Sequence, residues 1–165
     1  MNARAADTRL PPGVWRRPVV FLALGLGAGL APRAPGTAGT AAAVPLYLAL
    51  LPLSAGLRTG AVALLFAFGV VLCARAARVI GAHDHPAIVW DEIVGFLVTM
   101  LPAPRGWPWI VLGFVLFRGF DILKPWPIRW LDRNVGGGLG IMVDDLAAGL
   151  AAGAVLWLLA RIVGH

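Results

Sequence analysis

Apolar runs separated by short polar or proline-containing stretches make up most of the chain. We expect helices from the runs at residues 38–57, 60–79, 90–101, 109–123 and 144–163. A helix needs about 20 residues to cross the hydrocarbon core of a bilayer, and most of these runs approach that length. The pattern therefore predicts an all-α fold, a helical membrane bundle with about four spanning helices.

Two shorter stretches precede these runs. Residues 19–30 are apolar but contain three glycines and are too short to cross a bilayer, which predicts a short interfacial or re-entrant helix. Residues 1–18 are polar, basic and contain prolines, a composition typical of a flexible arm. We therefore expect a basic N-terminal arm over residues 1–18 and a membrane domain over residues 19–165.

Composition supports a membrane protein. Hydrophobic residues make up 59% of the chain and charged residues only 13%. The net charge of +6 could indicate a nucleic-acid partner, but the basic residues are scattered between apolar runs, so we expect no nucleic acid and instead contact with membrane lipids. The single cysteine, Cys73, allows no internal disulfide.

The distribution of basic residues predicts an orientation. If each apolar run after residue 40 reverses the side of the membrane, three of the fourteen basic residues fall on one side: Arg58, Arg105 and Arg161. The other eleven fall on the side that holds the loop before residue 41 and most of the acidic residues. Since basic residues concentrate in cytoplasmic loops, we expect the acidic residues to face the cytoplasm.

Acidic residues occur in blocks where helices are expected to begin. One block holds Asp84, Asp91 and Glu92, another holds Asp144 and Asp145, and Asp121 lies alone. Acids at helix N-termini can simply stabilise the helix dipole, but the repetition at two helices favours a shared site. Gathered carboxylates repel one another unless a cation lies between them, and their hard oxygen atoms favour Mg²⁺ or Mn²⁺.

Groups suited to a phosphate accompany these acids. Arg33, Arg118, Lys124 and Arg129 could contact phosphate oxygens, although Arg118, Asp121 and Lys124 could also form an ion-pair ladder along one helix face. The loop at residues 31–40 precedes a helix, so its backbone N–H groups with Thr37 and Thr40 could bind a phosphate, or the threonines could only cap the helix. No ATP-binding glycine loop or serine-hydrolase elbow is present in the sequence, so we expect metal-assisted phosphoryl chemistry on an anionic substrate.

Four ordered motifs resemble those of the phosphatidylglycerophosphatase A family. They are PxxPGTxGT at 32–40, HDHPxIVWDExxG at 83–95, FRxFDIxKPWP at 117–127 and GxxGIMxDDxxAG at 137–149. The resemblance implies an all-helical, Mg²⁺-dependent phosphatase of the bacterial inner membrane that converts phosphatidylglycerophosphate to phosphatidylglycerol and inorganic phosphate. Where the family usually has serine, this chain has Thr40, which keeps a hydroxyl group.

Roles for individual residues follow as hypotheses. The expected metal ligands are Asp91, Glu92, Asp144 and Asp145, with Asp84 and Asp121 completing the shell or activating the attacking water. Direct attack by water is favoured, and an aspartyl-phosphate intermediate is the alternative. His83 or His85 could protonate the leaving oxygen. The expected phosphate contacts are Arg33, Thr37, Thr40, Arg118, Lys124 and Arg129. The alternatives are an ion-coupled membrane transporter and a non-catalytic helical membrane subunit, neither of which would release phosphate.

Overall fold

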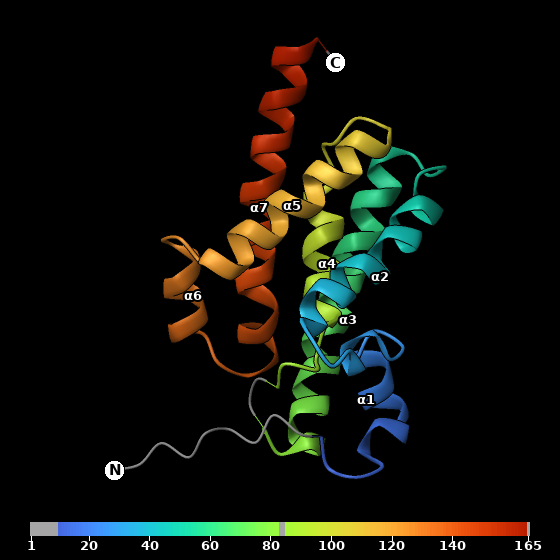
Figure 1. Cartoon of the computed structure of the whole chain (residues 1–165), viewed down its shortest axis with the longest axis vertical. Coiled ribbons are helices and arrows are strands. Elements are labelled where there is room, and N and C mark those ends of the chain that lie inside the picture. Colours follow the sequence, from blue (N-terminus) through green and yellow to red (C-terminus); the bar gives the residue numbers. More distant parts are fainter. Residues whose placement is uncertain (1–9, 83–84, 165) are drawn as a thin grey trace.

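The computed structural model describes residues 10–82 and 85–164, and over these residues it contains only helices, turns and loops (Figure 1). The predicted all-α class is confirmed. The helices are a 3₁₀ turn at Val14–Arg16, α1 at Pro18–Ala23, a second 3₁₀ turn at Ala28–Leu30, α2 at Pro35–Leu50, α3 at Ala55–Ile80, α4 at Trp90–Thr99, α5 at Trp107–Leu123, α6 at Ile128–Asn134 and α7 at Gly137–Val163.

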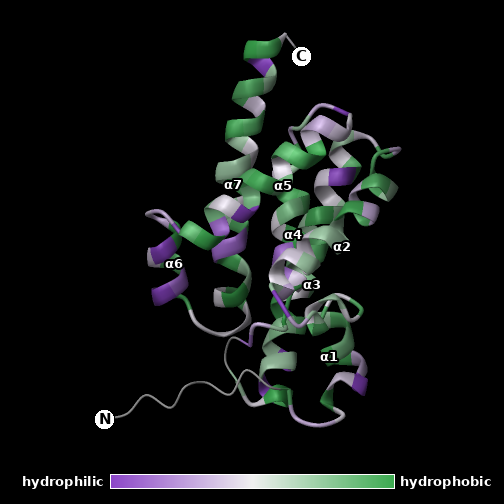
Figure 2. Ribbon diagram, viewed as in Figure 1, coloured by the Kyte–Doolittle hydropathy of each residue, from purple (hydrophilic) through white to green (hydrophobic). Residues whose placement is uncertain are grey.

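Two helices are long and apolar enough to cross a membrane, judged by length and composition. They are α3, with 26 residues, and α7, with 27. The prediction of about four spans is not confirmed, because α2 has 16 residues, α5 has 17 and α4 only 10. Figure 2 shows hydrophilic residues on α6 and on the neighbouring part of α7, whereas most of the C-terminal part of α7 is hydrophobic.

Helix α4 is the buried centre of the bundle. Eight of its ten residues are buried, and it packs against α2, α3 and α7. The Thr99 hydroxyl donates to the Gly95 carbonyl within α4 (3.0 Å) and lies 3.3 Å from the Gly149 carbonyl of α7. A Cβ at position 149 would lie 2.4 Å from the Gly95 carbonyl oxygen, so glycine is required for this close approach. The contact fixes how the first turn of α4 faces α7.

Several predicted boundaries were wrong. Helix α7 begins at Gly137, seven residues before Asp144, and α2 begins at Pro35, so that Thr37 and Thr40 lie inside a helix and not in a loop. The loop between α2 and α3 lies at residues 51–54, whereas the apolar runs placed the break after residue 57, and the Ser54 hydroxyl caps α3 by accepting from the Leu57 N–H (3.4 Å). Helix α6 was missed, because its seven residues form no long apolar run.

The N-terminal expectations fare differently. A short helix that cannot span is confirmed by the six residues of α1 and the turns after it. The division at residue 18 stays a prediction, since residues 1–9 lie outside the described residues. Within the described part of the expected arm, Val14 is buried.

Candidate metal and phosphate site

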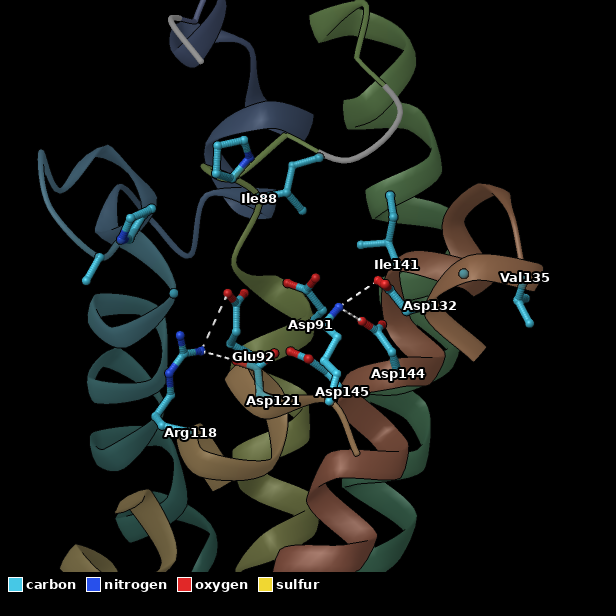
Figure 3. Close-up of a pocket in the computed structure, with 16 residues that line it drawn as sticks. Ile88, Asp91, Glu92, Arg118, Asp121, Asp132, Val135, Ile141, Asp144 and Asp145 are labelled. Carbon is cyan, nitrogen blue, oxygen red and sulfur yellow. Dashed lines mark hydrogen bonds and ion pairs between the residues drawn. The ribbon is translucent and has the colours of Figure 1, made fainter. Parts of the chain in front are cut away.

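One cavity of about 420 Å³ collects the acidic residues from separate helices (Figure 3). Its wall is built by the start of α2, the loop before α4, the first turn of α4, the end of α5, α6 and α7. The charged residues that line it are Asp91, Glu92, Arg118, Asp121, Lys124, Asp132, Asp144 and Asp145. The structure therefore brings together most of the residues expected to share a site, while their chemical roles stay predictions.

Three carboxylates lie close enough to bind one ion. Asp91, Glu92 and Asp145 each offer an oxygen atom, and these three atoms lie within 4.8 Å of one another. Asp91 and Asp145 are buried and Glu92 is partly buried. Among the described residues, three buried oxygen atoms here have no hydrogen-bond partner: Asp91 Oδ1, Glu92 Oε2 and Asp145 Oδ2. Buried oxygen atoms without partners are rare in proteins, and this donor set fits a hard divalent cation such as Mg²⁺.

The electrostatics of the cluster point the same way. Burial raises the pKa of the Asp91 carboxyl well above its ordinary value, and the negative charges of Glu92 and Asp145 raise it further. Burial also raises the pKa of Glu92, although the Arg118 guanidinium lowers it in part. A bound cation would offset both the burial of these carboxylates and the repulsion between their negative charges.

The two acid pairs reach the cavity differently. Asp91 and Glu92 lie in the first turn of α4, as predicted. Asp144 and Asp145 were expected at the start of a helix. They lie further along α7, whose first turn contains no acidic residue. The helix dipole acts mainly within the first turn, so it does not account for this buried pair.

Asp144 faces a lysine and not the three-carboxylate cluster. Lys124 Nζ donates to Asp144 Oδ2 (2.6 Å) and to Asp132 Oδ1 (2.6 Å), which ties the end of α5 to α6 and α7. Burial alone would lower the pKa of Lys124, but the two carboxylates raise it above its ordinary value. Asp132 was not predicted as a site residue, since no sequence signal connects it to a lysine eight residues away across two prolines.

Arg118 and Asp121 form a second ion pair at the cavity wall. Arg118 Nη1 lies 2.5 Å from Asp121 Oδ2 and 3.8 Å from Glu92 Oε1. The ion-pair ladder considered from the sequence is therefore present for Arg118 and Asp121 but does not include Lys124. The Arg118 Nε is buried and has no hydrogen-bond partner among the described residues.

Gly36 places the start of α2 against this ion pair. A Cβ at position 36 would lie 2.2 Å from Glu92 Oε1 and 3.0 Å from both terminal nitrogens of Arg118. Only glycine leaves room for these side chains here. The backbone of the first turn of α2 thus forms part of the cavity wall, a contribution that the sequence indicated only as a loop.

The structure does not bring four of the expected phosphate contacts into the cavity wall. The side chain of Thr40 is fully buried and its hydroxyl donates to the Gly36 carbonyl (2.9 Å), so its phosphate contact stays a prediction. Arg33 is exposed beside the cavity-lining residue Ala34. Arg129 is exposed and donates to the Leu123 carbonyl (3.2 Å), and Thr37 is partly buried within α2.

Of the expected histidines, the structure describes His85, which does not line the cavity that holds the acids. His83 and Asp84 lie outside the described residues. His85 is buried, and its Nδ1 accepts a hydrogen bond from the Ala87 N–H (3.1 Å). It lines a neighbouring cavity with Pro32 and Pro35, while the adjacent Pro86 lines both cavities.

Together these groups give the cavity two chemical sides. Three carboxylates suited to a metal form one side, and the Arg118 guanidinium forms the other, paired with Asp121 and adjacent to Glu92 at the boundary. A volume of about 420 Å³ can hold a phosphate with part of the group it esterifies. The arrangement suits binding and hydrolysis of a phosphate monoester.

Comparisons with known proteins agree with this chemistry. The sequence model of the family described as phosphatidylglycerophosphatase A matches residues 21–160. The chain is 46% identical to the phosphatidylglycerophosphatase A of Escherichia coli, over 88% of this chain and 83% of that protein. It is 43% identical to the phosphatidylglycerophosphatase A of Haemophilus influenzae, over 85% of this chain and 87% of that protein.

A third relative, from Bacteroides thetaiotaomicron, is 39% identical over 79% of this chain and 86% of that protein, and its name proposes a phosphatidylinositol-3-phosphatase activity. No solved structure matches the chain.

Proposed function

The chain belongs to the phosphatidylglycerophosphatase A family, and on this premise we propose that it hydrolyses phosphatidylglycerophosphate to phosphatidylglycerol and inorganic phosphate. The enzyme is a lipid phosphatase of phosphatidylglycerol synthesis. The observation that carries the proposal is the family match over nearly the whole chain. A cavity with three metal-competent carboxylates beside an arginine supports it.

The proposed cofactor is Mg²⁺, held by Asp91, Glu92 and Asp145. Their three oxygen atoms without hydrogen-bond partners support this choice. When bound there, the ion would polarise a phosphoryl oxygen and lower the pKa of a bound water. Asp144 is proposed as a positioning residue that holds Lys124 and not as a ligand, because its Oδ2 accepts from Lys124 Nζ.

Arg118, opposite the three-carboxylate cluster, would bind the phosphate. Arg118 offers a positive charge that neutralises phosphate oxygens, and Asp121 orients its guanidinium group. In the proposed reaction a water oxygen attacks phosphorus and the bond from phosphorus to the glycerol oxygen breaks. Asp121 is the described carboxylate proposed to take the water proton, and a histidine, with His83 the candidate, to protonate the leaving oxygen.

Association with the membrane follows from the two long apolar helices and the bacterial relatives. We propose the bacterial inner membrane, with the cavity on the cytoplasmic side. The distribution of arginines supports this orientation, because Arg58 and Arg105 do not line the cavity: Arg58 lies in the first turn of α3, and Arg105 donates to the Leu51 carbonyl just before that helix (3.3 Å). Helices α2 and α5 would complete a multi-pass bundle of about four spans.

Phosphate release by the purified protein tests the function. The assay uses phosphatidylglycerophosphate in detergent micelles, with Mg²⁺ or with EDTA, and phosphatidylinositol 3-phosphate as a second substrate. We expect Mg²⁺-dependent release from phosphatidylglycerophosphate and its loss in Asp145→Asn. A transporter or a structural subunit would release none. Release that persists in EDTA would refute the metal assignment but not the phosphatase.

A further inference from the structure

Residues 126–134, called here the tryptophan segment, carry exposed aromatic side chains at the edge of the cavity. Trp126 is 83% exposed and Trp130 is 55% exposed. The end of α5, just before the segment, exposes two further apolar side chains, Ile122 and Leu123. A surface of this kind on a monomer marks a contact with a membrane or another protein.

Contacts with α3 give the depth of the segment. A Cβ at Gly138, near the start of α7, would lie 2.0 Å from the Val70 carbonyl oxygen and 2.7 Å from Ala74 Cβ. The start of α7, which follows α6 by two residues, is therefore level with Val70 and Ala74 of α3, next to Arg75. Arg75 closes the uncharged stretch of α3 at residues 59–74, which is about 24 Å long and somewhat shorter than a typical hydrocarbon core.

The other end of the segment lies slightly deeper. Lys124, two residues before Trp126, donates to Asp144, which is about 10 Å along α7 from its start. The segment thus occupies the last 10 Å or so before the uncharged stretch ends. Tryptophan is enriched at this depth because its ring is apolar and its N–H is polar.

The charges of the segment indicate whether it contacts lipid or a protein partner. Arg129 and Arg133 are exposed, and within the described part of the chain neither forms an ion pair with a carboxylate. The acid of the same helix, Asp132, is engaged by Lys124. The two arginines form a cationic stripe beside the tryptophans, a combination that fits a leaflet containing anionic lipids.

The segment also adjoins the cavity. Its Asp132 lines the cavity, as do Lys124 and Val135 on either side of the segment, and Lys124 forms an ion pair with Asp132. From this geometry we infer that the tryptophan segment is an interfacial anchor, which binds the anionic headgroup layer and holds the cavity opening at the depth of the lipid phosphates. A lipid substrate then reaches the carboxylates without leaving the bilayer, a consequence that rests on the proposed function.

Depth measurements test the anchor without any enzyme assay. Spin labels are placed by Trp130→Cys and Arg133→Cys, with Leu64→Cys in the exposed middle of α3 as the hydrocarbon reference. Cys73 is buried, and the labelled wild type serves as its control. In vesicles of phosphatidylcholine and phosphatidylglycerol, accessibility to oxygen should rank 64, then 130, then 133, and accessibility to a water-soluble nickel chelate should rank the reverse.

Equally high accessibility to the nickel chelate at positions 130 and 133 would overturn the inference, because the segment would then lie in water. Labels that neither reagent reaches would also overturn it, by indicating a protein partner. Because Trp130→Cys removes one anchor residue, brominated lipids give a second measurement. The difference in tryptophan fluorescence between wild type and Trp130→Phe is the emission of Trp130. Brominated lipids should quench this emission, and emission of Trp130 that they do not quench would contradict the anchor.

An activity comparison tests the consequence. The variant Trp126→Ala/Trp130→Ala should lose about tenfold or more in kcat/KM on vesicles and less than about twofold in detergent micelles. Trp107→Ala, an exposed tryptophan at the far end of α5, is the matched control and should show no such difference. Equal losses in both systems would leave only a structural role. A wild type that releases no phosphate would refute the proposed function, while the label depths would still decide on the anchor.

Discussion

Replacing Gly36 by alanine adds a single methyl group where α2 meets the cavity. The new Cβ would lie 2.2 Å from Glu92 Oε1, whereas an ordinary van der Waals contact is about 3.4 Å or longer. The carboxylate must therefore withdraw by about 1 Å, since the helix backbone moves less easily than the end of a side chain. Arg118, whose terminal nitrogens would lie 3.0 Å from the same Cβ, must shift as well.

A displacement of about 1 Å at reacting groups can lower the rate about 100-fold. We expect this loss for Gly36→Ala, with a higher Mg²⁺ concentration needed for half-maximal activity. The free energy of unfolding should fall by no more than about 2 kcal/mol, because overpacking costs about 1–3 kcal/mol and alanine gains about 0.5–1 kcal/mol over glycine in a helix. Phosphate release at varied Mg²⁺ and thermal unfolding in detergent measure the two effects.

Gly119→Ala is the matched control. This glycine lies in α5 next to Arg118, and a Cβ there would meet nothing within 4 Å. It should keep its activity and become slightly more stable. Activity of Gly36→Ala within about twofold of wild type would refute the proposed fit between α2 and Glu92.

Four further predictions concern the site. Asp145→Asn should raise the Mg²⁺ requirement for activity at least about 100-fold and Asp144→Asn much less, because only Asp145 offers an oxygen to the three-carboxylate cluster; equal shifts would contradict this division. Lys124→Met leaves Asp132 and Asp144 unpaired and should lower the free energy of unfolding by about 1–3 kcal/mol, part of which Asp144→Asn should restore in the double variant. Burial raises the pKa of Asp91, so the folded chain holds the proton of this carboxyl more tightly than the unfolded chain does. In EDTA the melting temperature should therefore fall as pH rises through the raised pKa of Asp91, and saturating Mg²⁺ should abolish this fall. A melting temperature that does not change with pH in EDTA would argue against burial of the carboxyl. Thr40→Val removes only a hydrogen bond within α2 and should change KM less than about twofold while destabilising the fold by about 1 kcal/mol; a large rise in KM would restore the phosphate role.

Hydrophobic pattern alone located most of the helices but not their starts. The last helix was expected to begin only at Asp144, after Gly137, Gly138 and Gly140, because glycine favours turns. In the fold they belong to α7, where Gly138 permits contact with α3 and Gly140 with the Val135 carbonyl. This packing offsets the weak helix propensity of glycine, and no local signal distinguishes the two cases.

The candidate site was predictable in kind and less so in detail. Repeated acids at separate helices indicated a shared cluster, and the structure gathers them. Which member of the Asp144–Asp145 pair faces α4 depends on helix rotation, since adjacent residues point about 100° apart. Arg33 and Arg129 were chosen for their charge alone, and their exposure depends on how α2 and α6 pack against their neighbours.

The uncharged parts of the helices are short for a membrane of average thickness. All 16 residues of α2 are uncharged, and α3 has an uncharged stretch of the same length at residues 59–74, each about 24 Å long. A typical hydrocarbon core is about 30 Å thick, and a bilayer adapts to a short protein by thinning around it. Such thinning would draw nearby lipid phosphates toward the carboxylates, and we expect lipids with shorter acyl chains to gather around the enzyme.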